Sequence, residues 1–228
     1  MGWKSFLLNF VSEKWASMSE EKVLSGRAEV HERIIDVAAE QFRVNGIRSV
    51  RMDDIASLTG ISKRTLYEEF EDKETLLKAV LVKFKGIMNR ELTEICTTSS
   101  NTLEVILRIF DCHLRFMRDT NPKYFQDMQR YPDLVAEFHE TRQGHQDQAR
   151  LFLQRGVEEG SFRKDFNLDV FLRMHNSMSE NMKSLVADME FYDVFRSTIM
   201  VALRGISTPM GLKQLDEFLE RMDKEIIK

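Results

Sequence analysis

The sequence predicts an all-α protein. Its 228 residues include only 10 glycines and 3 prolines, the residue types that disturb helix interiors most. Apolar residues recur at intervals of three and four along most of the chain, and no stretch alternates apolar and polar residues as a half-buried strand would. These observations together favour helices from residue 27 to residue 227.

The first predicted helix covers residues 27–46. Its apolar face consists of residues four apart, namely Val30, Ile34, Ala38 and Phe42. Asn45-Gly46 is expected to end it, because these two residue types readily adopt the left-handed conformation that closes helices.

Two shorter helices follow, at 52–58 and 63–70. Gly60 interrupts the chain between them, and Ser62 is placed to cap the N-terminus of the second. A fourth, long helix begins after Asp72. Its apolar stripe consists of Leu77, Val80, Leu81, Phe84, Met88 and Leu92.

After a polar loop at 97–102, the pattern stays helical. Further helices are predicted at 103–119, 122–130, 132–156, 168–188, 191–206 and 211–227. Residues 1–26 are expected to form an amphipathic N-terminal extension. Its apolar residues are Trp3, Phe6, Leu7, Phe10, Val11 and Trp15. An alternative interpretation is that translation begins at Met18.

The composition limits the classes of function that the protein can have. With 33 basic and 37 acidic residues the net charge is −4, so nucleic-acid binding would need a local basic patch. Two cysteines, Cys96 and Cys112, supply neither a disulfide framework nor a four-ligand zinc site, which favours a cytoplasmic protein. No apolar run reaches the length of a membrane-spanning helix.

The first three helices form a candidate helix-turn-helix domain. Its small core is expected to contain Ile34, Ala38, Phe42, Ile55, Ala56, Leu58, Ile61, Leu66 and Phe70. The outer face of helix 63–70 carries Lys63, Arg64, Thr65 and Tyr67, suited to base edges and phosphates in a major groove. Since residues 27–85 hold 11 basic and 11 acidic residues, non-specific DNA affinity should be modest.

This region resembles the DNA-binding domain of the tetracycline-repressor (TetR) family of transcription regulators. The shared motifs are A-x-x-x-F-x-x-x-G (Ala38, Phe42, Gly46), D-I-A (Asp54 to Ala56), G-I-S-x-x-T-L-Y-x-x-F (Gly60 to Phe70) and K-E-x-L-L (Lys73 to Leu77). The resemblance covers about 45 residues and implies an N-terminal three-helix DNA-binding domain (27–75) followed by a larger helical effector-binding and dimerisation domain (76–228).

The resemblance also implies which residues touch DNA. They are Arg51, Ser62, Lys63, Arg64, Thr65, Tyr67 and Lys73. By this resemblance, the family positions that contact bases or nearby phosphate correspond to Lys63, Arg64 and Thr65. Tyr67 matches a position that touches the DNA backbone or a thymine methyl. Lys73 matches a position that contacts a phosphate. Arg51 departs from the usual Thr or Ser and cannot cap a helix in the same way. Glu68 is unusual near DNA; it either accepts from a cytosine or points away.

The C-terminal domain resembles the family in layout only. Helices 168–188 and 191–206 carry apolar residues over a wider arc than one buried stripe, which predicts a homodimer interface, although two ordinary core helices would show the same pattern. The candidate effector pocket consists of Phe110, His113, Phe116, Met117, Phe125, Met128, Met174 and Met178. Core filling is the alternative for each of these residues.

Catalytic, metal and cofactor motifs are not found in the sequence. The histidines lack ligand spacing, and neither a nucleophile elbow nor a phosphate-binding loop occurs. We therefore expect a non-enzymatic, ligand-responsive transcription regulator, a repressor that leaves a palindromic operator when a small apolar effector binds. The alternatives are a helical adaptor that uses the same domain to bind protein, and a helical enzyme with a DNA-binding-like domain.

Overall fold

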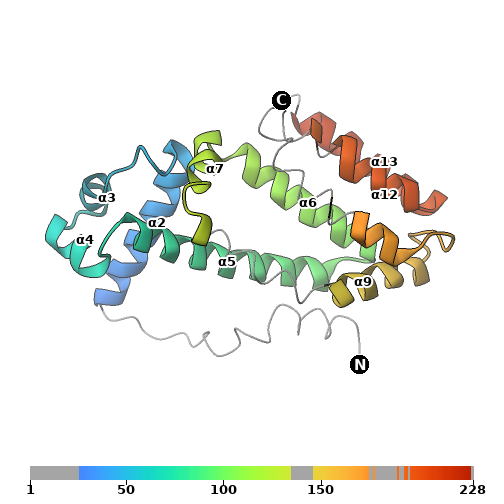
Figure 1. Ribbon diagram of the computed structural model, residues 1–228, viewed down its shortest axis with the longest axis horizontal. Helices are drawn as coiled ribbons and strands as arrows, with labels where there is room; N and C mark the ends of the chain where they lie inside the picture. Colours follow the sequence, from blue (N-terminus) through green and yellow to red (C-terminus); the bar gives the residue numbers. More distant parts are fainter. Residues whose placement is uncertain are drawn as a thin grey trace. The chain divides into compact units, whose positions relative to one another are not determined.

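The computed structural model describes residues 26–134, 146–174, 177, 189, 193–194 and 196–226 (Figure 1). Helices dominate these residues, and the only β pairing among them is an isolated bridge between Phe162 and Ser207. The all-α prediction is confirmed. The chain divides into two compact units, the first comprising 1–97 and 115–141 and the second 98–114 and 142–228.

Most predicted helices agree with the structure. The described helices of the first unit are α2 (Gly26–Asn45), α3 (Met52–Thr59), α4 (Lys63–Glu69), α5 (Lys73–Thr98) and α7 (Pro122–Met128). Helix α6 (Thr102–Arg118) contributes to both units. The prediction for 122–130 is two residues too long, since Gln129 and Arg130 form a turn.

A single core holds α2, α3, α4 and the start of α5 together, and Figure 1 shows these helices grouped at one end of the first unit. Its most deeply buried side chains are Ile34, Phe42, Ile47, Ile55, Leu66, Leu76 and Leu77. The predicted place of Leu58 in this core is wrong, because its side chain is 57% exposed. Helix α3 buries Met52, Ile55, Ala56 and Thr59, and that face leaves Leu58 to one side.

The turn between α3 and α4 has the predicted glycine stop. Gly60 is left-handed, with φ 69°. Its N–H donates to the Ser57 carbonyl over 3.2 Å, and the Ile61 N–H donates to the Ala56 carbonyl over 3.1 Å. This hydrogen-bond pair is a Schellman motif, which satisfies the last carbonyls of α3 and sets the direction in which α4 begins.

The C-terminal end of α2 is fixed by the segment that starts α7. Asn121 donates through its backbone N–H to the Arg43 carbonyl and through Nδ2 to the Val44 carbonyl, both over 2.9 Å. The Arg48 N–H donates to Asp127 Oδ2 over 2.7 Å. Between these contacts Gly46 has φ 82°, and a Cβ built there would lie 2.9 Å from Cβ of Lys123. Glycine is needed here for both reasons.

The second unit has its own core. Besides residues 102–114 of α6, it contains α9 (Gln146–Glu158), the π-helical turn η2 (Arg196–Met200), α12 (Val201–Ile206) and α13 (Pro209–Ile226). The buried residues of this core include Leu103, Leu153, Met200, Leu203, Leu215 and Phe218 on these helices and Phe162 after α9. Helix α13 starts two residues before its prediction, because proline fits the first turn of a helix.

Several sequence predictions lie wholly or partly outside the described residues. These are the extension 1–26 apart from Gly26, positions 135–145 of helix 132–156, positions 175–188 of helix 168–188 apart from Ser177, positions 191, 192 and 195 of helix 191–206, position 227 of helix 211–227, and Met178.

We expect Gly46→Ala to lower the free energy of unfolding by about 1–3 kcal/mol, because alanine is strained at this φ and meets Lys123. Urea denaturation measures the change. Gly86→Ala is the control: Gly86 lies within α5, and a Cβ there meets nothing within 4 Å. It should raise the free energy of unfolding by about 0.5–1 kcal/mol. Equal destabilisation by both substitutions would contradict this account.

Candidate nucleic-acid interface

Helix α4 is the predicted recognition helix, and its N-terminus is capped as expected. Ser62 Oγ accepts from the Thr65 N–H over 3.1 Å, and the two hydroxyl oxygens of Ser62 and Thr65 lie 2.8 Å apart. Ser62 is exposed and Thr65 is half-buried. The cap orders the end of the helix that a DNA-reading helix presents to base edges.

The outer face of α4 presents cationic and aromatic groups to solvent. The Arg64 side chain is 88% exposed and that of Lys63 is 65% exposed. Tyr67 is 50% exposed. Packing of Tyr67 as a core residue is therefore excluded, and Phe70 instead stacks on His31 with ring centroids 4.7 Å apart.

Each cation of α4 is held by a carboxylate. Arg64 Nε donates to Glu68 Oε1 over 2.8 Å, one turn along the same helix. Lys63 Nζ forms an ion pair with Asp53 in the first turn of α3. All four side chains remain largely exposed, so the pairs can exchange partners at little cost.

Arg51 lies at the N-cap of α3. Its guanidinium offers only donors, so it makes no side-chain cap bond; the N3 carboxylate of Asp54 instead accepts from the Arg51 N–H over 2.8 Å. Since Arg51 is exposed, its side chain is available to solvent while Asp54 supplies half of the capping arrangement.

Lys73 has a structural role in addition to its predicted DNA contact. Its ammonium donates to the carbonyls of Val50 and Arg48 over 2.6 and 3.2 Å. Partial burial lowers the pKa of Lys73, against the opposing attraction of Asp127 and Asp54. The first residue of α5 thereby holds the segment between α2 and α3, and one of its three N–H donors remains for another acceptor.

Glu69 anchors the end of α4 to α2. It accepts from Arg27 Nε over 2.7 Å and from His31 Nδ1 over 2.9 Å. The hydrogen bond from His31 lowers the pKa of Glu69; partial burial opposes the change, and Arg27 adds to it. Sequence reasoning missed these contacts, because the partners are 38 and 42 residues apart and share no motif.

The predicted pocket residues divide between the two units. In the first unit Phe116, Met117, Phe125 and Met128 are half-buried, and the Phe116 ring lies 4.8 Å from that of Phe84 and 6.1 Å from that of Phe125. In the second unit Phe110 is half-buried against the core. His113 is exposed and bonded to the Ile109 carbonyl, and Met174 is 51% exposed.

Among the described residues of the predicted dimer helices, three large apolar side chains are exposed. Val170 and Met174 are 62% and 51% exposed, and Val201 on α12 is 60% exposed. Other members of these helices, including Ile199, Leu203 and Ile206, are buried in the core of the second unit.

The described part of the chain holds no group of three or more His, Cys, Asp or Glu side chains that could bind a metal ion. Among the same residues, no helix combines the length and apolar character needed to span a membrane.

Residues 34–80 match the sequence family described as bacterial regulatory proteins, tetR family. A relative from Mycolicibacterium smegmatis, named HTH-type transcriptional repressor KstR2, is 26% identical over 80% of this chain and 93% of its own. A repressor of the same name from Rhodococcus jostii is 27% identical over 65% of this chain and 76% of its own.

Solved structures agree on the fold. A transcriptional regulator from Cytophaga hutchinsonii superposes with a TM-score of 0.58 at 23% identity, covering 78% of this chain and 98% of its own. A gamma-butyrolactone receptor superposes with a TM-score of 0.56 at 17% identity, covering 87% of this chain and 99% of its own.

Glu69→Gln tests the anchor between α4 and α2. We expect it to lower the free energy of unfolding at neutral pH by about 1 kcal/mol, because glutamine keeps the geometry but loses the charge. Since the folded state lowers the pKa of Glu69, this advantage of the parent is present above the ordinary value of 4.5 and is lost as the pH falls through the folded-state pKa.

Chemical denaturation of both proteins from about pH 7 to about pH 3 measures the difference. The Glu71→Gln variant is the control, because Glu71 is exposed and the substitution makes the same change in charge without touching Arg27 or His31. A constant Glu69→Gln deficit down to the lowest pH would contradict the assigned role.

Proposed function

Because the chain belongs to the TetR family of bacterial transcription regulators, we propose that it is a repressor that binds a palindromic operator as a homodimer and leaves it when a small apolar effector binds. The observation that carries this proposal is the capped N-terminus of α4 with Lys63, Arg64 and Tyr67 exposed beside it. A helix end of this kind combines cations, hydroxyls and the positive end of the helix dipole.

Each predicted contact has a chemical role in this proposal. Lys63 and Arg64 donate to guanine edges or to phosphates, and Tyr67 contacts the sugar-phosphate backbone or a thymine methyl. The hydroxyls of Ser62 and Thr65 reach phosphate from the helix end. Arg51 and Lys73 bind phosphates, Lys73 with the donor that its two carbonyl contacts leave.

Homodimerisation would place two α4 helices in successive major grooves, about 34 Å apart. The exposed apolar residues Val170, Met174 and Val201 support the predicted interface through 168–188 and 191–206. Such residues are unfavourable in water and are covered when a second copy packs on them.

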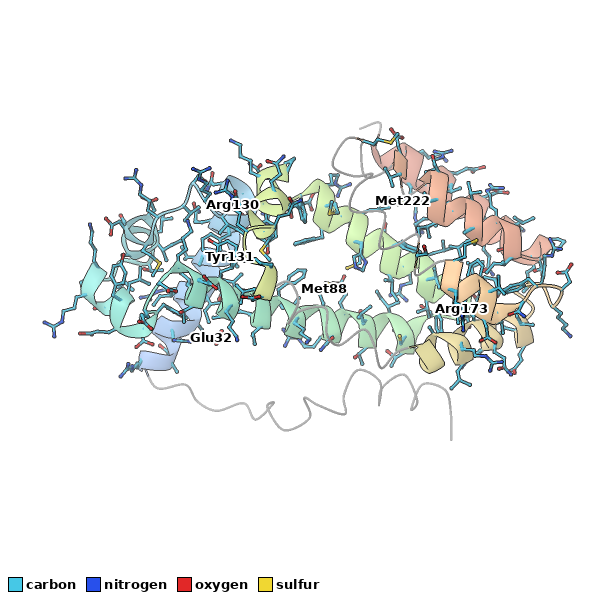
Figure 2. The ribbon with its side chains drawn as sticks, in the orientation of Figure 1. Glu32, Met88, Arg130, Tyr131, Arg173 and Met222 are labelled. Carbon is cyan, nitrogen blue, oxygen red and sulfur yellow. The ribbon has the colours of Figure 1, made fainter. Side chains whose placement is uncertain are left out.

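Effector response would act through α5. Lys73 binds the carbonyls before α3, and Lys83 forms ion pairs with Glu32 (labelled in Figure 2) and Asp36 on α2, with distances of 2.8 and 2.7 Å. A movement of α5 would therefore carry the three-helix domain with it. An apolar effector that favours the moved state would depopulate the DNA-competent state.

The names of the matched relatives support a repressor rather than a protein-binding adaptor. The proposal includes action in the cytoplasm, where operator DNA is reached, and no enzymatic step. An electrophoretic mobility shift with DNA from upstream of the protein's own gene, at low salt and without effector, tests DNA binding directly. Failure to shift this DNA would favour the adaptor.

We expect Arg64→Ala to weaken binding to the upstream fragment by about 10- to 100-fold, because one base or phosphate contact per subunit is lost. Fluorescence anisotropy measures the affinity. Arg163→Ala is the matched control, since Arg163 is an exposed arginine paired with a nearby aspartate in the second unit. If both substitutions weaken binding equally, the loss reflects overall charge rather than a contact by α4.

We expect Val201→Glu to convert the dimer to a monomer, because a charge placed in the proposed interface would be buried without a partner. Light scattering coupled to size exclusion measures the mass. Leu151→Glu changes a comparably exposed apolar residue on α9, outside the proposed interface, and should leave the dimer intact. A dimeric Val201→Glu protein would contradict the predicted interface.

A further inference from the structure

We infer that Asp53 and Glu68 are specificity-determining residues, which hold the DNA-contacting cations of α4 in intramolecular ion pairs and so suppress binding to DNA that lacks the operator. This inference rests on the proposed DNA-binding function. It assigns a positive role to two carboxylates that would otherwise only weaken attraction to a polyanion.

The helix-turn-helix segment from Arg51 to Phe70 has a negative net charge, which disfavours binding to DNA of arbitrary sequence. It contains three basic and four acidic residues, which gives a net charge of −1. The affinity of proteins for non-specific DNA comes almost wholly from cations that replace counterions on phosphates. A segment of this charge gains little from phosphates alone.

The four carboxylates fall into two classes. Asp54 and Glu69 have structural partners: Asp54 accepts from the Arg51 N–H, and Glu69 accepts from Arg27 and His31. Asp53 and Glu68 instead pair with Lys63 and Arg64, the two exposed cations at the start of α4. Half of the acidic groups in the segment are thus directed at the groups that would contact DNA.

Each pair occupies one donor of its cation, Nε of Arg64 or one N–H of Lys63, and places a carboxylate beside the donors that remain. A carboxylate and a phosphate present similar anionic oxygens to Lys and Arg, so a phosphate that binds these side chains must either displace Asp53 and Glu68 or lie next to their negative charge. The pairs are exposed, hence weak and exchangeable, yet the displaced carboxylates then lie near phosphates and repel them.

This competition weakens binding to random DNA more than binding to the operator. A random duplex offers α4 only phosphates, whereas an operator adds base-edge contacts that compensate for the broken ion pairs. Asp53 and Glu68 would therefore raise the ratio of operator affinity to non-specific affinity, which is the quantity that matters among many competing sites.

The experiment measures binding of full-length protein to a random-sequence duplex of about 30 base pairs by fluorescence anisotropy over a series of salt concentrations. We expect Asp53→Asn and Glu68→Gln, each alone, to raise this affinity by about 2- to 30-fold at low salt, since a dimer carries two copies of the changed pair. The slope of log K against log salt should steepen by about 0.9 for each additional phosphate that the variant neutralises.

Glu40→Gln is the matched control. Glu40 is an exposed carboxylate paired with Arg43 on α2, so the substitution makes the same change in net charge away from α4. It should leave the affinity and the salt slope near those of the parent. A thermal melt of each variant checks folding, and Glu68→Gln, whose residue makes no cap, tests the inference even if Asp53→Asn unfolds α3.

Unchanged affinity and slope in both variants, or an equal rise in affinity in Glu40→Gln, would overturn the inference. Its failure is distinguishable from failure of the proposed function. If Lys63→Ala and Arg64→Ala weaken binding to the upstream fragment while the two carboxylate variants have no effect, the DNA-binding function stands and only the inference falls. If the alanine variants also have no effect, α4 does not contact DNA, and both fall.

Discussion

The structure depends on one constraint: a seven-residue helix must be held rigidly although it is too short to be stable alone. Isolated helices shorter than about 12–15 residues are marginal in water. Helix α4 is therefore ordered by its surroundings, through burial of Leu66 and Phe70, the Ser62 cap and the Glu69 contacts to α2. Every group that the helix offers to solvent takes its position from those anchors.

The carboxylates around α4 fall into two groups, according to whether they hold the helix in place or pair with its exposed cations. The carboxylates of Asp54 and Glu69 accept hydrogen bonds that hold the helices in place. Those of Asp53 and Glu68 form ion pairs with the exposed cations of α4. Under the proposed function, the negative net charge of this surface is consistent with recognition that relies on base contacts. Strong attraction to any duplex would defeat a protein that has to find one site.

Two elements outside the three-helix domain fix it in place. Helix α5 does so through Lys73 and Lys83, and α7 does so through its N-cap Asn121 and through Asp127 near its end. The contacts of Lys73, Asn121 and Asp127 are directional hydrogen bonds, which tolerate only small displacements, and those of Lys83 are ion pairs with two carboxylates of α2. The three-helix domain is consequently tied to the elements that would have to respond to an effector.

Local signals in the sequence determined most of the described helices and their caps, and they singled out α4 as the predicted recognition helix. Ser62, Gly60 and Gly46 could be predicted because caps and left-handed stops depend on neighbours within a few residues. The exposed position of Leu58 was missed, because apolar character alone does not say which side of a short helix meets the core.

Only the tertiary structure decided which charged side chains have hydrogen-bond or ion-pair partners, and which partners these are. Lys73 binds carbonyls 23 and 25 residues away, Glu69 binds partners 38 and 42 residues away, and Asp127 binds the Arg48 N–H 79 residues away. Such pairings follow from how helices pack rather than from sequence spacing. For that reason the sequence could identify the side chains on the outer face of α4, whereas their ion-pair partners on other helices were determined by the packing of the helices.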